Sequence, residues 1–199
     1  MSALAKNYNR RKIAFKRGKG SFLYSTNGKR YLDFVQGIVV NSLGHANLYL
    51  TKAMNKQAKK VWHISNAFII PEGEKLAKIL AQKTFADYVI FQNSGTEAVE
   101  AAIKVARRYF YSIRKPHKNR ILCIKNSFHG RTLAAIYASG SKKMIEGFGP
   151  KVDGFDHFKF GDHKSLKKLI TKKTAAIMIE DCLGEGGCKL IPDWCLRDI

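Results

Sequence analysis

The sequence predicts an α/β fold built around a mostly parallel sheet. Three short apolar runs are each followed by a cluster of small and polar residues, and these runs occupy residues 88–91, 121–124 and 175–179. Short β-type runs that alternate with helical segments are typical of βαβ units. Because ligands of such sheets bind beyond the carboxyl ends of the strands, we expect the clusters that begin at Asn93, Asn126 and Glu180 to meet at one edge.

The segment before residue 87 predicts other elements. Residues 21–34 are expected to form two short strands around Asn27 and Gly28, because Asn-Gly readily adopts the positive φ of a hairpin turn. Leu76 and Leu80 share one face of an amphipathic helix. The remaining predicted elements, in chain order, are a loop at residues 37–47 and helices over residues 51–60 and 73–83.

The composition limits the classes of partner. The 199-residue chain carries a formal net charge of +21, and clustered Lys and Arg would favour nucleic acid. The lysines are instead spread over segments with helical spacing, such as residues 51–60 and 163–173, so solvated helix faces explain the charge and no nucleic-acid partner is expected. No apolar run approaches the roughly 18 residues that a membrane span needs, so no membrane partner is expected either.

The cysteines and the N-terminus bear on the compartment. The four cysteines contain no C-x-x-C pair, which favours a reducing, cytosol-like compartment and no metal site. Residues 1–20 are strongly basic and lack the apolar core of a secretory signal. An Arg-rich start without acidic residues is also typical of an organellar transit segment, so that alternative stays open at this point.

Residues 93–109, NSGTEAVEAAIKVARRY, open a predicted helix with four small polar residues. Ser94 and Glu97 fit a capping box, with Ser94 at the N-cap. A cap alone does not need Gly95 at the first helical position, where glycine lowers helix propensity. Gly95 and Thr96 would let an anion reach free backbone N–H groups at the positive end of the helix dipole. The segment therefore predicts a phosphate cup, although neither G-x-G-x-x-G nor G-x-x-x-x-G-K-[ST] occurs.

The clusters after the second and third apolar runs carry further candidate residues. Phe128 could stack on a flat ligand ring or simply cap the core, and His129 could serve a site or be an ordinary hydrogen-bonded residue. Arg131 suits bidentate binding of a carboxylate. Glu180 and Glu185 lie in a glycine-rich loop, where they could bind substrate, restrain an arginine or be exposed loop acids.

Five motifs, in order, resemble the N-terminal half of class III pyridoxal-phosphate aminotransferases. They are YLDFVQGIVVNSLGH, HISNAFIIPEGEKLAKIL, NSGTEAVEAAIKVARRY, SFHGRT and E-x-x-x-GEGG. The resemblance implies an α/β, aspartate-aminotransferase-like large domain, truncated here and preceded by an N-terminal segment of the small domain. Residues 1–48 would belong to the small domain and residues 49–199 to the large one. Because the resemblance begins near Tyr8, no room is left for a transit segment, and a cytoplasmic location is expected.

The resemblance also implies a cofactor and roles for the matching positions. The cofactor would be pyridoxal 5'-phosphate, with its phosphate on the backbone N–H groups of Gly95 and Thr96 and its ring stacked on Phe128. The implied cofactor-binding residues are Ser94, Gly95, Thr96, Phe128 and His129. The implied substrate-binding residues are Arg131, Glu180, Glu185 and Asn41. Asn41 lies in a segment that family members bring to the active site at a dimer interface, so a homodimer of the full-length protein is expected.

Some positions depart from the family pattern. In the third sheet-edge motif, usually EP[VI]QGEGG, Asp181 replaces the proline and Leu183 replaces the glutamine, which removes a fixed φ and an amide. Leu48 replaces a proline, and Gln92 is bulkier than the residue expected there. Nothing matches the lysine that forms a Schiff base with the cofactor or the aspartate that pairs with its ring nitrogen, so we expect both beyond Ile199. The 199-residue chain alone is therefore expected to be inactive.

The expected reaction is transfer of the terminal amino group of N-acetylornithine to 2-oxoglutarate. It would yield N-acetylglutamate 5-semialdehyde and glutamate, a step of arginine biosynthesis. One alternative is another ω-aminotransferase acting on succinylornithine, ornithine or 4-aminobutyrate, because a carboxylate clamp such as Arg131 suits all of these substrates. Two alternatives from other classes are a non-catalytic paralogue that keeps the phosphate cup and a nucleic-acid binder that depends on charge alone.

Overall fold

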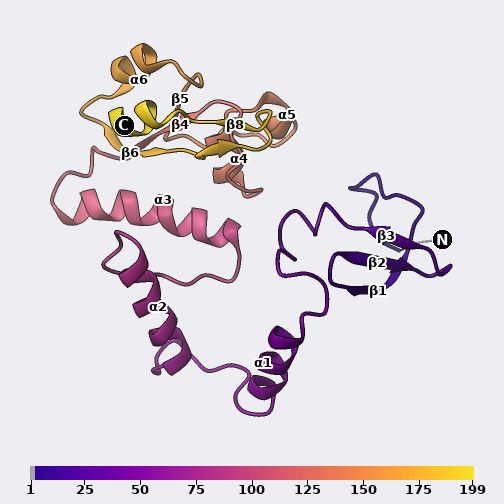
Figure 1. Ribbon diagram of the computed structural model, residues 1–199. Coiled ribbons are helices and arrows are strands. Elements are labelled where there is room, and N and C mark those ends of the chain that lie inside the picture. The colour runs from indigo at the N-terminus through magenta and orange to yellow at the C-terminus, as the bar shows by residue number, and fades with distance from the viewer. Residues whose placement is uncertain (1–2) are drawn as a thin grey trace. The chain divides into compact units, whose positions relative to one another are not determined.

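A computed structural model describes residues 3–199 of the chain, apart from the side chain at position 198. The chain divides between Phe85 and Ala86 into two compact units (Figure 1). The expected division into small-domain and large-domain parts, at residues 48 and 49, stays a prediction.

The first unit holds a small antiparallel sheet followed by two helices. The sheet has the strand order β1-β2-β3. The predicted strand pair around Asn27 and Gly28 is confirmed as β2 and β3, whereas β1 was not predicted. Both predicted helices are confirmed as α1 and α2. The bounds are β1 Phe15–Lys19, β2 Phe22–Ser25, β3 Arg30–Leu32, α1 Leu48–Ala58 and α2 Pro71–Lys83.

An aspartate and a histidine close the loop that follows this sheet. One oxygen of Asp33 accepts hydrogen bonds from the backbone N–H groups of Val35 and Gln36, at 3.1 and 2.9 Å. Its other oxygen lies 2.7 Å from His45 Nε2. The His45 ring lies so close to β1 that a Cβ added at Gly18 would stand 2.5 Å from its Cγ. The YLDF and LGH motifs thus form one structural clasp between Asp33 and His45.

The second unit contains a parallel sheet with helices on both faces (Figure 1). Its strand order is β5-β4-β6, and β7 and β8 form a separate antiparallel pair. The strands predicted at residues 121–124 and 175–179 are confirmed, as is the helix predicted near Thr96. The bounds are α3 Gly95–Ser112, β4 Arg120–Ile124, α4 Leu133–Ser139, α5 Lys142–Ile145, β5 Phe155–Phe158, α6 His163–Leu169, β6 Thr174–Met178, β7 Cys182–Leu183, β8 Lys189–Leu190 and α7 Asp193–Asp198.

The core of the second unit lies on both sides of β4. Ile121 and Cys123 belong to one buried apolar cluster, and Leu122 and Ile124 belong to another. This alternation follows from the two-residue period of a strand, whose successive side chains point to opposite faces. Cys123 has no exposed surface, and its burial raises the pKa of its thiol to about 12. The fully buried part of this central strand, residues 121–124, is therefore apolar on both faces.

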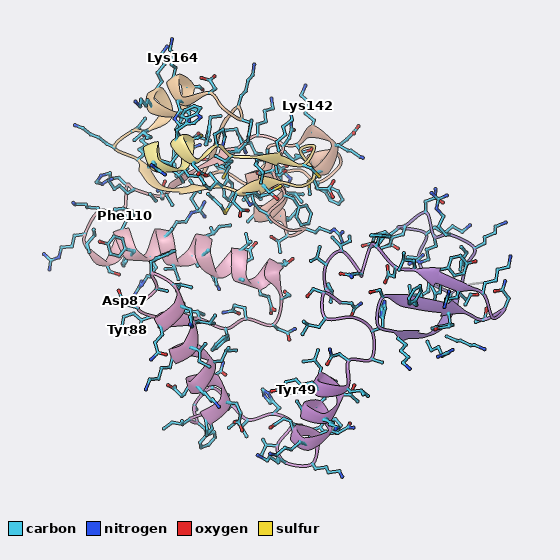
Figure 2. The ribbon with its side chains drawn as sticks, in the orientation of Figure 1. Tyr49, Asp87, Tyr88, Phe110, Lys142 and Lys164 are labelled. Atoms are coloured by element: carbon cyan, nitrogen blue, oxygen red, sulfur yellow. The ribbon has the colours of Figure 1, made fainter. Side chains whose placement is uncertain are left out.

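The predicted strand at residues 88–91 is wrong. This stretch forms no ladder with any other strand in residues 3–199. Tyr88, labelled in Figure 2, is 92% exposed, and Ile90 is 64% exposed. A strand depends on hydrogen bonds from a neighbouring strand, and an apolar run cannot by itself supply that neighbour.

The described part of the chain contains no helix that is both long enough and apolar enough to cross a membrane.

We predict that Asp33→Asn lowers the melting temperature at neutral pH. The contacts with His45 and Gln36 hold the pKa of Asp33 below its ordinary value of 3.8. A lowered carboxyl pKa stabilises the fold above that ordinary value, and this stabilisation is lost as the pH falls through the lowered pKa. The variant should therefore lose less stability than the natural protein as the pH falls from about 4 to about 2, the range that begins at the ordinary pKa and extends below it.

Thermal unfolding followed by circular dichroism across this pH range measures both effects. Glu72→Gln on α2 is the control, because the structure shows no ion pair for this exposed carboxylate. Identical acid sensitivity of Asp33→Asn and the natural protein would show that the clasp does not contribute to stability.

Candidate functional site

Three clusters of small and polar residues meet at one edge of the second unit, as predicted. β4 and β6 are neighbouring parallel strands, so the residues that follow them leave the sheet on the same side. A carboxylate oxygen of Glu180, after β6, accepts a hydrogen bond of 2.8 Å from the backbone N–H of Phe128, after β4. The loop after β4 also reaches the first turn of α3, because a Cβ added at Gly130 would lie 3.2 Å from Thr96 Oγ1.

The start of α3 is a capped helix end. Ser94 is the N-cap, as predicted, and its Oγ accepts a 3.2 Å hydrogen bond from the backbone N–H of Glu97. The Ser94 hydroxyl in turn donates to Glu97 Oε2 at 3.1 Å. The predicted capping box is therefore altered, since Glu97 accepts from the serine side chain. The cap leaves the backbone N–H groups of Gly95 and Thr96 without an acceptor among the described residues.

Gly95 is not required by its protein surroundings. A Cβ added at this position would meet no atom within 4 Å, and its φ is outside the left-handed region that favours glycine. A glycine at the first position of a helix is also unfavourable relative to most residues. The open space above Gly95, next to two free N–H groups at the positive end of an 18-residue helix, fits a bound anion.

The loop after β4 is held from the inside by a serine and a histidine. Ser127 is buried, and its hydroxyl donates to the carbonyl oxygen of Ile124 at 2.7 Å. His129 Nε2 lies 2.8 Å from the same hydroxyl oxygen. Because the single hydroxyl proton goes to Ile124, Nε2 carries a proton and donates to Ser127. His129 is 7% exposed, and burial first, then the nearby His157, lowers its pKa below the usual value. The imidazole is therefore neutral at pH 7.

A threonine joins the same loop to two helices. Thr132 is the N-cap of α4, where its Oγ1 accepts a 3.2 Å hydrogen bond from the backbone N–H of Ala135. The same hydroxyl donates to Glu100 Oε1 on α3. Because Gly130 has a φ of +120°, which side-chain-bearing residues rarely adopt, the chain can turn between Phe128 and Thr132 while it touches α3.

The third cluster forms the hairpin of β7 and β8. Asp181, which stands in the place of the family's proline, accepts a backbone hydrogen bond from Ile191 at 2.9 Å. Leu183, in the place of glutamine, is 2% exposed and belongs to the core. The path of this loop is thus fixed by the strand pair and by burial, in place of the φ restriction that proline would give. Glu185 is exposed in the turn of the hairpin.

The structure brings together part of the predicted set of residues. Thr96, Phe128 and Glu180 share one edge, and Phe128 is half-buried there. Arg131 lies on the same loop and is exposed, and Asn41 lies in the first unit. Sequence reasoning missed the positioning residues of this loop, which are Ser127, Thr132 and Glu100. Thr132 was the detectable one, because a threonine directly before an apolar run is an N-cap signal.

This edge can hold a ligand that combines an anion with a flat ring. The α3 N-terminus offers backbone donors for the anion, and Phe128 offers an aromatic face on a loop whose backbone is fixed by Glu180. Within residues 3–199, no group of three or more His, Cys, Asp or Glu side chains is placed to hold a metal ion.

We predict that Glu180→Ala lowers the free energy of unfolding by about 1–3 kcal/mol, because the half-buried N–H of Phe128 loses its carboxylate acceptor. Amide hydrogen exchange at Phe128 should also accelerate. Urea unfolding and exchange measured by NMR test the two effects. Glu185→Ala removes an exposed glutamate from the same hairpin region and should change stability by less than about 0.5 kcal/mol. Equal effects of the two variants would refute the positioning role of Glu180.

Comparison with known proteins adds to this geometry. A family model described as aminotransferase class-III matches residues 3–199. An acetylornithine aminotransferase from Agrobacterium fabrum is 54% identical over 182 residues, which cover 92% of this chain and 46% of that protein. An acetylornithine aminotransferase from Rhodobacter capsulatus is 48% identical over 197 residues, which cover 99% of this chain and 50% of that protein. The chain spans about half the length of the curated relatives that it matches.

Solved structures show the same likeness. The ornithine aminotransferase from Toxoplasma gondii has a TM-score of 0.91 at 28% identity and covers 98% of this chain and 47% of its own. An (S)-enantioselective ω-transaminase from Thermomicrobium roseum has a TM-score of 0.88 at 27% identity, with 98% of this chain and 51% of its own covered. The α/β, aspartate-aminotransferase-like fold expected from the sequence is confirmed by these structures.

Proposed function

The chain belongs to the class III aminotransferase family, and from this premise we propose that its protein transfers amino groups with pyridoxal 5'-phosphate as cofactor. The observation that supports the cofactor most directly is the start of α3. Two free N–H groups and an open space at Gly95 suit a phosphate group, and Phe128 suits the attached ring. When bound, the cofactor supplies an electron-withdrawing ring that stabilises negative charge on the carbon that carries the amino group.

We propose that the residues of the sheet edge position the cofactor. The N–H groups of Gly95 and Thr96 would bind the phosphate, with Ser94 capping the helix that presents them. Phe128 would stack on the ring, and Glu180 would hold the Phe128 backbone in place through its hydrogen bond to the Phe128 amide. In this proposal His129 contributes indirectly, by holding the loop in place, because its Nε2 proton is already donated to Ser127.

We propose that the substrate is bound by groups around this position. Arg131 is exposed on the same loop as Phe128, and its guanidinium suits a carboxylate of the amino donor or of 2-oxoglutarate. Glu185 and Asn41 are proposed to line the substrate side. Charge pairing between Arg131 and the carboxylate would orient the amino group toward the cofactor, which is the main contribution that a binding residue makes to such a transfer.

The proposed amino donor is N-acetylornithine and the proposed acceptor is 2-oxoglutarate. Relatives named acetylornithine aminotransferase are 48–54% identical over almost all of this chain, which supports this choice. The alternative is another ω-amino donor such as ornithine, because the structures with high TM-scores include an ornithine aminotransferase and an ω-transaminase. A homodimer and a cytoplasmic location are proposed together with this activity.

A steady-state assay of the full-length protein tests the proposed substrates. With 2-oxoglutarate as acceptor, we expect kcat/KM for N-acetylornithine to exceed that for ornithine, succinylornithine and 4-aminobutyrate by at least about tenfold, the factor that corresponds to about 1.4 kcal/mol of transition-state binding. A higher kcat/KM for another donor would replace the proposed substrate. No transfer with any donor would favour a non-catalytic paralogue.

We predict that Gly95→Val in the full-length protein weakens pyridoxal phosphate binding by more than about tenfold. The branched side chain would fill the space that the phosphate needs, while an added Cβ meets no protein atom within 4 Å. The free energy of unfolding should therefore change by less than about 0.5 kcal/mol. Binding is followed by the absorbance of the bound cofactor, and stability by urea unfolding of the apo protein.

Gly73→Val is the matched control for this test. Gly73 also lies in the first turn of a helix, α2, where an added Cβ would meet only ordinary contacts at 3.7 Å. This variant should keep the affinity for pyridoxal phosphate. If Gly95→Val also keeps it, the phosphate does not bind at the start of α3.

A further inference from the structure

We propose that a cavity of the second unit binds an amphipathic anion, a small molecule with a flat apolar body and a phosphate or carboxylate group. The cavity has a volume of about 530 Å³. It lies beside β5, the C-terminal end of α4, and α5. The proposed cofactor site lies instead at the N-terminal ends of α3 and α4. Lys125, at the start of the loop after β4, is one of the residues that line the cavity.

The apolar part of the cavity is an edge of the hydrophobic core. Tyr137 and Phe155 line it and are buried, and Ile145 and Val152 line it and are half-buried. All four belong to the same apolar cluster or pack against it. A surface of this kind favours an aromatic or aliphatic body, because its burial removes apolar area from water.

Three lysines surround this apolar surface. Lys125, Lys142 and Lys151 line the cavity and are exposed, and none of its lining residues is acidic. Among the described residues, no ion pair involves any of the three. An anion bound among these three ammonium groups would be attracted by all of them. A phosphate or carboxylate is therefore the polar group that the cavity suits.

The walls of the cavity are fixed before any ligand arrives. His157 Nε2 lies 2.9 Å from the carbonyl oxygen of Tyr137 and 3.1 Å from that of Ala138, which ties β5 to α4. The His157 ring stands where a Cβ of Gly140 would be, at 2.5 Å. Tyr137 Oη donates to the carbonyl oxygen of Phe148 at 3.2 Å and holds the loop after α5. Such preorganisation reduces the entropy lost on binding.

The cavity favours a small molecule over a polyanion. Nucleic acid is bound by cations that follow its backbone, with aromatic side chains exposed for the bases. Here the cations converge on one cavity, and the aromatic rings of Tyr137 and Phe155 are buried in its wall. This arrangement matches a single ring that carries one anionic group.

Calorimetric titration of the full-length protein with phenyl phosphate tests the proposal. Phenyl phosphate should bind more tightly than either inorganic phosphate, which lacks the ring, or phenol, which lacks the charge. The double substitution Lys142→Gln and Lys151→Gln should weaken its binding by about tenfold, because it removes two positive charges that attract the anion. Lys142→Glu, which reverses one charge, should weaken it at least as much.

The matched control is the double substitution Lys164→Gln and Lys167→Gln on α6. It removes the same charge from exposed lysines that do not line the cavity. Figure 2 shows Lys142 and Lys164 on separate helices of this unit. The control should change the affinity by less than about twofold, since exposed charges more than a Debye length away are screened.

Several outcomes would overturn the proposal. They are equal losses in the two double variants, binding of inorganic phosphate as tight as that of phenyl phosphate, or loss of phenyl phosphate binding in Gly95→Val, which would place the ligand at the start of α3. Circular dichroism of each variant shows whether it is folded, and Lys142→Glu gives an independent reading if one double variant is not.

Discussion

The hydrogen bond from the Phe128 amide to the Glu180 carboxylate is the constraint on which the candidate site depends. β4 and β6 run side by side in parallel, so the loops that leave their carboxyl ends must share one edge of the sheet. A loop there has backbone N–H groups that no longer have strand partners. Glu180 supplies one acceptor, and Gly130 and Thr132 then bring the rest of the loop against α3.

Much of the fold could be predicted from the sequence where the local pattern decides the structure. The Asn27 and Gly28 turn, the amphipathic helices and the two apolar strands all follow from local preference. The strand expected at residues 88–91 failed because strand formation needs a partner that a run of residues does not reveal. β5 was missed because it has a partner strand but lacks an apolar run. Its polar residues Asp156 and His157 interrupt the apolar pattern that predicts a strand. Asp156 pairs with Arg120 on β4, and His157 contacts the carbonyl groups of α4, so both have partners far away in the sequence.

The candidate site shows the same division. Spacing alone identified Ser94 as a cap and placed three clusters at one edge of the sheet. It could not show that Glu180 reaches an amide 52 residues earlier in the chain, or that Thr132 bonds to Glu100. The buried hydrogen bond of His129 shows why residue type alone predicts a functional role poorly. A histidine beside a candidate ligand site can simply stabilise the loop that carries it.

The burial of Cys123 gives the protein a built-in reporter of its own unfolding. Cys123 lies in the middle of the central strand, in register with His157 on one side and Met178 on the other. Its thiol has no exposed surface and its pKa is raised to about 12, so a thiol reagent can reach a reactive form only after the strands separate. Cys188 is exposed and should react in the native state. Labelling of Cys123, once distinguished from that of Cys195, which is also buried, therefore follows the opening of the parallel sheet without any engineered probe.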